Sequence, residues 1–166
     1  MIPEQLQADA VAQAVEAFDA RALTGGKIDR GEVTLEIAPA NIASVCGFLK
    51  HDQGFVRLSS VTAVDRYPAE PRFEIVYHLH SVQPQRRVRL KCRVSSGTDD
   101  RSSSSVNPQI DSVTGVWRAA NWYEREVFDL FGIRFLNHPD LRRIMLPETW
   151  EGYPLRKDYP VTGSRV

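Results

Sequence analysis

A chain of 166 residues with 42% hydrophobic and 25% charged side chains has the composition of one globular domain, because at this length roughly 70% of the unfolded surface can be buried. The 21 lysine and arginine residues balance the 21 aspartate and glutamate residues, so bulk charge does not favour a nucleic-acid partner. Cys46 and Cys92 lie far apart with no CxxC motif, which argues against a disulfide-stapled secreted module and against an iron–sulfur or zinc site built by this chain alone.

The N-terminal residues give no sign of a targeting segment. The start, MIPEQLQADAVAQAV, lacks a basic region and carries Glu4 and Asp9 early, so we expect no signal peptide. No run of about 18 apolar residues occurs, so no segment is expected to span a bilayer. We therefore expect a cytosolic chain that reaches a membrane only through a partner protein.

The first third of the chain predicts two helices and a strand. Apolar residues at i, i+3 and i+4 spacing predict an amphipathic helix over Gln5–Leu23, ended by Thr24-Gly25-Gly26. Strict alternation predicts a half-buried strand over Glu32–Ile37. Pro39 fits the first turn of a second helix, whose buried stripe is predicted to be Ile42, Val45, Cys46 and Leu49.

Three further strands are predicted at Phe55–Asp65, Phe73–His80 and Arg87–Val94, joined by short links that imply antiparallel hairpins. The polar stretch Ser95–Ser105 is predicted to be a mobile loop. The predicted fold class is α+β, with a single mixed or antiparallel sheet of about four to five strands and helices on one face. We divide the chain into an α+β part, residues 1–120, and a C-terminal helix with an extended docking arm, residues 121–166, of the same domain.

The strand at Arg87–Val94 carries a basic stripe on its outward face. Such a stripe suits phosphate tracking, but no aromatic residues alternate with it, as a platform for single-stranded nucleic acid requires. We expect its members to pair across the sheet with carboxylates on neighbouring strands, and we expect no nucleic-acid partner. The stripe is Arg87, Arg89, Lys91 and Arg93, and the carboxylates are Glu32, Glu36 and Glu74.

His78 and His80 stand two residues apart in a predicted strand, so both point to one face and are able to share a metal ion. A stand-alone metal enzyme that uses this pair is the alternative from a different functional class. The chain has no HxxxH pair, nucleophile elbow, phosphate loop or dinucleotide fingerprint. We therefore predict no catalytic, cofactor-binding or metal-binding residues.

The stretch from Asn121 is predicted to be a short amphipathic helix that ends at Gly132. Asn121 suits an N-cap, and Glu124 stands three residues on, as a capping box requires. The buried arc of the helix is predicted to consist of Tyr123, Val127, Leu130 and Phe131.

The two glutamates of this helix are not expected to act together. Glu124 and Glu126 point about 200° apart, so they cannot serve one substrate atom as acid and base. We expect each carboxylate to meet an arginine, with Arg142, Arg143 and Arg156 available. Arg125 and Asp129 are expected to form an i, i+4 ion pair.

After Gly132 four prolines exclude helix over most of the remaining residues. This docking arm is too apolar for a free loop, and its tryptophan, tyrosine and arginine content is typical of interface hot spots. We expect much of it to lie in a partner's groove. The prolines are Pro139, Pro147, Pro154 and Pro160, and the apolar residues are Leu141, Ile144, Met145, Leu146, Trp150, Tyr153, Leu155 and Tyr159.

Three segments of this region resemble the signature of one family. They are the ERExxDLF run that begins at Glu124, the HPDLRR run that begins at His138, and the PLRKDYP run that begins at Pro154. The resemblance is to the C subunit of NADH-quinone oxidoreductase, which belongs to the hydrophilic arm of respiratory complex I. It is dense over Trp117–Pro160 and looser upstream. Asn137 departs from the glycine that usually precedes His-Pro, and asparagine tolerates the same left-handed turn.

The resemblance implies a structural subunit that carries no cofactor, while FMN, iron–sulfur clusters and quinone are bound by partner subunits. It implies packing on the quinone-reducing D subunit, near the B subunit with the terminal cluster, on the cytoplasmic side of the bacterial inner membrane. The equivalent subunit of a membrane-bound hydrogenase or ferredoxin-linked complex is the alternative. The expected docking residues are Glu124, Arg125, Glu126, Asp129, His138, Arg142, Arg143, Trp150, Arg156, Lys157 and Asp158.

Overall fold

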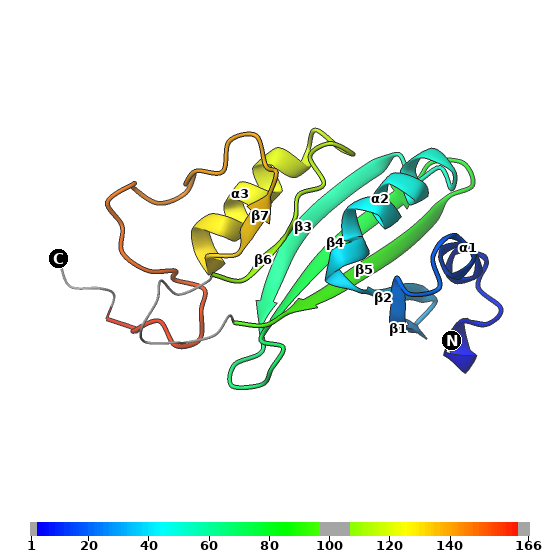
Figure 1. The fold of residues 1–166 in the computed structure, drawn as a ribbon, viewed down its shortest axis with the longest axis horizontal. Coiled ribbons are helices and arrows are strands. Elements are labelled where there is room, and N and C mark those ends of the chain that lie inside the picture. Colours follow the sequence, from blue (N-terminus) through cyan, green and yellow to red (C-terminus); the bar gives the residue numbers. More distant parts are fainter. Residues whose placement is uncertain (1–2, 97–106, 163–166) are drawn as a thin grey trace.

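The computed structural model describes residues 3–96 and 107–162 and is built on a mixed five-stranded sheet (Figure 1). The strand order is β1-β2-β5-β4-β3, and β3, β4 and β5 form the predicted antiparallel hairpins, while β2 runs parallel to β5. This confirms the predicted α+β class. The strands are β1 (Leu23–Asp29), β2 (Glu32–Ile37), β3 (Arg57–Asp65), β4 (Phe73–Ser81) and β5 (Arg86–Val94).

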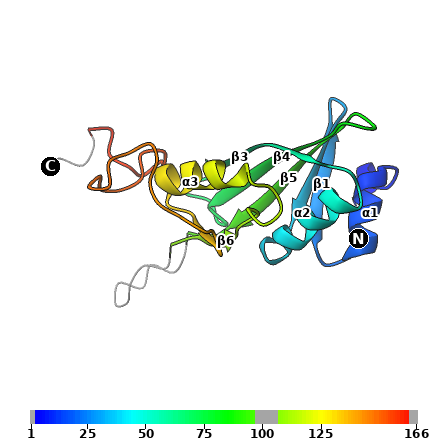
Figure 2. The same ribbon diagram turned by 90° about the horizontal axis from the view of Figure 1, so that it is seen from above.

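Helices α2 (Ile42–His51) and α3 (Ala120–Phe131) cover the same face of the sheet (Figures 1 and 2). Cys46 of α2 and Glu124 of α3 both lie close to Tyr77, a buried residue of β4. Helix α1 (Ala10–Phe18) packs at the β1 edge, where Phe18 stacks on Phe48 of α2 with ring centroids 4.4 Å apart. Of the helices in the described ranges, none has the length and apolarity needed to cross a bilayer.

The core forms between this sheet face and the helices. The stripe predicted for α2 is buried, as are the alternate residues Val88, Leu90, Cys92 and Val94 of β5. Alternation places these side chains on one face, since successive residues of a strand point to opposite sides. The sequence pattern therefore identified the inward face of the central strand correctly.

The N-terminal region differs from the prediction, because the expected helix stop is a strand. Gly25 and Gly26 lie inside β1, and a 3₁₀ turn at Glu4–Leu6 precedes the shorter helix α1, whose cap is Asp9. A Cβ atom at Gly26 would lie 2.4 Å from the Thr34 carbonyl oxygen, so this glycine permits close pairing with β2. Because β1 is a mostly exposed edge strand, it shows no apolar alternation.

Two further short strands were not predicted. Strands β6 (Gln109–Asp111) and β7 (Arg134–Leu136) pair in parallel and join the segments that flank α3. Three-residue strands are too short to show a hydrophobic period. The loop expected at Ser95–Ser105 falls, apart from its first two residues, outside the described residues.

Helix α3 begins earlier than predicted and ends where predicted. Its N-cap is Ala119 rather than Asn121, with no side-chain cap bond, because Glu124 turns inward instead of closing a capping box. Gly132 ends the helix in the left-handed conformation with φ 73°. This turn directs the following chain back toward the sheet, so Gly132 sets the starting direction of the arm.

Gly132→Ala should lower the free energy of unfolding by about 2 kcal/mol or more, because a non-glycine residue is strained at this φ. The added Cβ would also lie 2.4 Å from the Tyr153 ring. Gly47→Ala in α2 is the matched control, since no atom lies within 4 Å of its Cβ and alanine favours a helix by up to about 1 kcal/mol. Urea unfolding of both variants checks this, and equal effects would contradict it.

Candidate functional site

The docking arm, residues 133–162 of the described chain, leaves α3 and loops beyond the end of the sheet (Figure 1). After β7 it contains turns and bends but no helix within this range, as the prolines predicted. A segment with so few backbone hydrogen bonds of its own needs acceptors and donors from elsewhere. Buried and half-buried charged side chains supply them.

Asp129 is the first anchor of the arm. Its carboxylate is fully buried, and Oδ2 accepts hydrogen bonds from three successive backbone amides, those of Ile144 at 2.9 Å, Met145 at 2.6 Å and Leu146 at 3.0 Å. Burial by itself would raise the pKa of Asp129, but the bonds from Met145, Leu146 and Arg143 outweigh it and lower the pKa. The carboxylate is therefore charged and holds the arm against α3.

Arg143 extends this anchor along the arm. Its guanidinium donates to Asp129 Oδ1 at 2.7 Å and to the backbone carbonyls of Trp150 at 3.2 Å and Gly152 at 3.1 Å. It also lies over the Tyr153 ring at 5.3 Å. One arginine thus ties two separate turns of the arm to one buried carboxylate.

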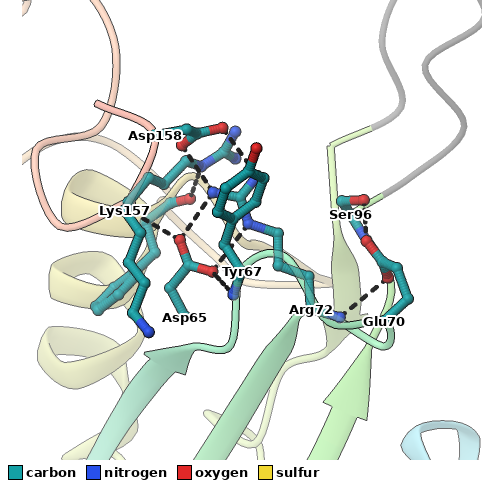
Figure 3. Close-up of polar contacts among 9 residues, drawn as sticks. Asp65, Tyr67, Glu70, Arg72, Ser96, Lys157 and Asp158 are labelled. Atoms are coloured by element: carbon teal, nitrogen blue, oxygen red, sulfur yellow. Dashed lines mark hydrogen bonds and ion pairs between the residues drawn. The ribbon is translucent and has the colours of Figure 1, made fainter. Parts of the chain in front are cut away.

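The second anchor is a three-membered ion cluster at the far end of the hairpin β3–β4 (Figure 3). Arg72 bonds Asp65 bidentately at 2.9 and 2.8 Å, and it bonds Asp158 of the arm at 2.9 and 2.7 Å. Asp65 also accepts from the backbone N–H of Lys157 at 2.8 Å and of Tyr67 at 2.9 Å. These contacts fix the turn at Lys157 and Asp158 to the sheet.

The pKa values in this cluster move in the direction that keeps every member charged. For Asp65, burial alone raises the pKa, but hydrogen bonds from Arg72, Lys157 and Tyr67 lower it well below its usual range. The bonds from Asp65 and Asp158 raise the pKa of Arg72. Lys157 contributes its backbone amide, while the residue as a whole is exposed.

Arg156 lies between the arm and the sheet. Its Nε donates to the carbonyl of Phe131 at 2.6 Å, and its guanidinium lies over the rings of Phe73 at 5.3 Å and Tyr153 at 4.6 Å. Burial, followed by the charge of Arg72, lowers the pKa of this guanidinium. A cation at a helix C-terminus is favourable, so Arg156 stabilises the turn at which α3 ends.

The expectation that Glu124 meets an arginine was wrong. Its carboxyl is fully buried and accepts from Ser112 Oγ at 2.6 Å and from the Val113 amide at 2.7 Å. Burial raises the pKa of Glu124 to about 7, although both hydrogen bonds act in the opposite direction. The turn before α3 places the Ser112 hydroxyl and the Val113 amide beside this carboxyl, and they take the place of an arginine. Glu124 therefore holds residues 112–113 against α3.

His138 lies beside Glu124 with its side chain enclosed. Nε2 donates to the Asn121 carbonyl at 3.2 Å, Nδ1 accepts from the Asp140 amide at 3.0 Å, and Glu124 Oε2 lies 4.0 Å from Nε2. Burial is the main cause that lowers the pKa of His138. The histidine therefore orients the start of the arm as a neutral ring.

Glu126 and Arg125 also depart from their predicted pairing. Glu126 is exposed and has no arginine partner among the described residues. Arg125 does not pair with Asp129; its Nε donates to the Arg142 carbonyl at 3.2 Å and its guanidinium lies 5.0 Å from the Trp122 ring centroid. Asp129 faces the arm and Arg143 instead, because three arm amides and a guanidinium offer it more hydrogen bonds.

Several large side chains of the arm and of α3 point outward. Met145 is 63% exposed, Leu155 is 51% exposed and Trp150 is 38% exposed, and Trp122 of α3 is 62% exposed. Arg142 is also exposed, and its guanidinium pairs with exposed Asp140 at 3.0 Å. The arm is thus held to the domain by polar groups, while these four apolar side chains and one arginine are exposed, where another protein can contact them.

Sequence reasoning missed three residues that hold this site together: Asp65, Arg72 and Ser112. The predicted hairpin could have indicated the contact between Asp65 and Arg72. Asp65 is the last residue of β3, and Arg72 immediately precedes β4, so antiparallel pairing brings them together. Ser112 had no comparable signal, because its contact with Glu124 depends on how the turn at 112–117 folds over α3.

His78 and His80 lie on the face of the sheet opposite to α2 and α3. Arg89 Nε donates to His78 Nε2 at 3.0 Å, and Ser60 and Ser59 bond the Nδ1 atoms of His78 and His80. Within residues 3–96 and 107–162, no three His, Cys, Asp or Glu side chains are grouped to hold a metal ion. A ring nitrogen of His78 that accepts from an arginine is not available to a metal.

The comparisons first define a class of protein. A solved chain from the structure of the membrane-bound sulfane sulfur reductase, an archaeal respiratory membrane complex, superimposes with a TM-score of 0.67 at 25% identity, over 91% of this chain and 84% of that chain. The fold is therefore similar to that of a chain in a respiratory membrane complex.

The particular family follows from the sequence matches. Residues 35–165 match the family described as the 30 kDa subunit of respiratory-chain NADH dehydrogenase. The NADH-quinone oxidoreductase C subunit of Geotalea uraniireducens is 47% identical over 134 residues, 81% of this chain and 76% of that protein. Its counterpart in Salinispora tropica is 43% identical over 96% of this chain and 62% of that protein. The chain belongs to this family, which confirms the predicted resemblance.

Asp129→Asn should release the arm, because it leaves Arg143 without its charged partner and places an amide against three N–H donors. We expect a loss of about 3–5 kcal/mol, as for a broken buried ion pair. Hydrogen exchange at the amides of Ile144, Met145 and Leu146 should accelerate most. Asp140→Asn is the control, since it removes only an exposed pair worth up to about 1 kcal/mol. Unchanged exchange at these three amides would contradict the anchor.

Glu124→Gln should remove a pH dependence of stability. Between the ordinary value of 4.5 and the folded pKa of about 7, the folded state retains a proton that the unfolded state releases. Stability therefore falls as pH rises through this window, by about 3 kcal/mol at most. Urea unfolding below pH 4.5 and above pH 7 should show that the native chain loses about 3 kcal/mol relative to Glu124→Gln across this window, because the other titrating groups are common to both. Exposed Glu126→Gln should retain this loss.

Proposed function

We propose that this chain is a structural subunit, without a cofactor of its own, of the proton-translocating NADH:quinone oxidoreductase, complex I or NDH-1. It braces the quinone-reducing D subunit, close to the B subunit with the terminal cluster, and so supports electron transfer from NADH to quinone. FMN, the iron–sulfur clusters and quinone are bound by partner subunits. The chain is peripheral, at the cytoplasmic side of the bacterial plasma membrane, and meets the membrane only through the complex.

One observation carries this proposal: polar contacts anchor the arm to the domain, yet the apolar side chains of Met145 and Leu155 face outward. Asp129 and Arg72 satisfy the polar groups of the arm internally, while Met145 and Leu155 remain more than half exposed. An arm that is ordered before binding loses little conformational entropy when it docks. Exposed apolar residues on an ordered segment suit a permanent protein interface.

A second candidate is the equivalent subunit of a related membrane-bound complex, such as a hydrogenase or ferredoxin-linked enzyme. The fold similarity to a chain of the archaeal sulfane sulfur reductase complex favours it. The docking arm serves the same bracing role in both candidates. They differ in the electron donor, which other subunits bind.

Substitution of the outward residues should separate docking from folding. Arg142→Glu, and the double change Met145→Asp with Leu155→Asp, should each reduce co-purification of the quinone-reducing subunit by about tenfold or more, as loss of hot-spot contacts does. Both variants should keep the thermal stability of the native chain, because these side chains are exposed. Arg156→Glu is unsuitable for this purpose, since it breaks contacts within the chain.

The measurement is recovery of the tagged chain from membranes solubilised in mild detergent, with the accompanying subunits identified. Arg21→Glu is the control, because the Arg21 side chain is 91% exposed beside α1, outside the arm. Flavin- and cluster-bearing subunits that oxidise NADH are the expected companions. Nickel-bearing subunits with hydrogen activity would move the chain to the second candidate. Full recovery of the quinone-reducing subunit with Arg142→Glu and with the double variant at Met145 and Leu155 would exclude docking through these residues.

A further inference from the structure

The sheet face opposite α2 and α3 carries more positive than negative charge. Over strands β2, β5, β4 and β3 and the residue that follows β3, six cations face three carboxylates. We call this the cationic face, and the described residues place no helix over it (Figure 2). The cations are Arg57, Arg66, Arg87, Arg89, Lys91 and Arg93, and the carboxylates are Glu32, Glu36 and Glu74.

Two of the three carboxylates on this face are already paired with cations of the same face. Glu74, buried between strands, meets Lys91 at 2.7 Å, Arg66 at 3.0 Å and Arg93 at 3.4 Å. Glu32 meets Arg89 at 2.6 Å. The expected cross-strand pairing thus forms for Glu32 and Glu74, while no ion pair joins Glu36 to the stripe among the described residues. One carboxylate that serves three cations leaves the face electropositive.

A row of three basic side chains at one end of this face has no carboxylate within it. Register places Arg57 of β3 opposite His80 of β4, and His80 opposite Arg87 of β5. Burial, then the charges of Arg87 and Arg57, lowers the pKa of His80. The neutral His80 ring therefore lies between two guanidinium groups of like charge, and an anion placed over the row would be attracted by both.

The row borders a hollow that is large enough for carboxylate side chains. The hollow has a volume of about 490 Å³, and Arg57, His80 and Arg87 line it together with Ser81 and Gln85. Glu32 also lines it, but that carboxylate is bonded to Arg89. The lining therefore offers two exposed guanidinium groups and neutral donors to a ligand.

We infer that the cationic face is a second docking surface, which binds a carboxylate-rich segment of a neighbouring subunit through the row Arg57–His80–Arg87. This inference rests on the proposed function as a subunit of a larger complex. Charge complementarity of this kind fixes partner and orientation. The row borders a hollow rather than a flat surface, and a protein segment is able to place individual carboxylates in it beside the arginines.

This surface is separate from the docking arm. The row begins at Arg57, the first residue of β3, and the Arg72 cluster lies at the last residue, Asp65. A nine-residue strand spans about 26 Å at 3.3 Å per residue. The two surfaces therefore contact different parts of the assembly, and variants of one leave the other intact.

Zero-length cross-linking of the purified complex tests the inference. In the variant Arg87→Lys, which retains the charge, a carbodiimide should join the new amine to an Asp or Glu of another subunit within an acidic segment. Arg21→Lys is the control, which should link only to Asp19 beside it. Links from position 87 only to Glu32 of this chain, or no link at all, would overturn the inference.

Charge reversal provides a second readout. Arg57→Glu with Arg87→Glu should remove the protection of that acidic segment from hydrogen exchange, whereas Arg57→Lys with Arg87→Lys should preserve it. Retention of the quinone-reducing subunit in the reversed variant distinguishes this loss from failure of the proposed arm docking. Binding of the isolated native chain to phosphatidylglycerol vesicles, lost in the reversed variant and without a protein cross-link, would assign the row to a membrane instead and overturn the inference.

Discussion

Buried carboxylates hold this structure together. The arm that follows α3 is interrupted by prolines and makes few backbone hydrogen bonds of its own, so its amide groups need fixed acceptors. Asp129 provides one acceptor to three successive amides and to Arg143, and Asp65 provides the other to Lys157 and to Arg72. A buried charge is tolerated only when it is satisfied in this way. These two residues fix the arm at 144–146 and at 157–158.

The anchors also decide which residues are available to a partner. Arginines at this density suggest an interface, but Arg143 and Arg156 are used inside the chain. Met145, Leu155 and Arg142 remain exposed. Under the proposed function, charge orders the arm and exposed apolar side chains dock it. This division is reasonable because buried ion pairs give geometry, while apolar area gives most of the affinity of permanent interfaces.

The sequence predicted a structural feature correctly where a local pattern, such as an apolar stripe, a strict alternation or a helix-ending glycine, allows only one structure. The apolar stripe of α2, the alternation of β5 and the stop at Gly132 were predicted and found. It failed at β1, whose exposed glycine-rich strand carries no periodic signal. It also failed for Glu124 and Arg125, because a helical wheel gives the direction of a side chain but not the identity of the group that meets it.

The sequence by itself determined the α+β class, the position of the main strands, and the family, since local periodicity and a long specific motif do not depend on the rest of the molecule. Only the tertiary structure decided the partner of each charge. Asp65, Arg72 and Asp158 come together from a hairpin and from an arm more than eighty residues away (Figure 3). Such contacts depend on how the arm crosses the end of the sheet. That path is fixed by packing and hydrogen bonding between segments that are distant in the sequence. Local sequence patterns do not predict such contacts.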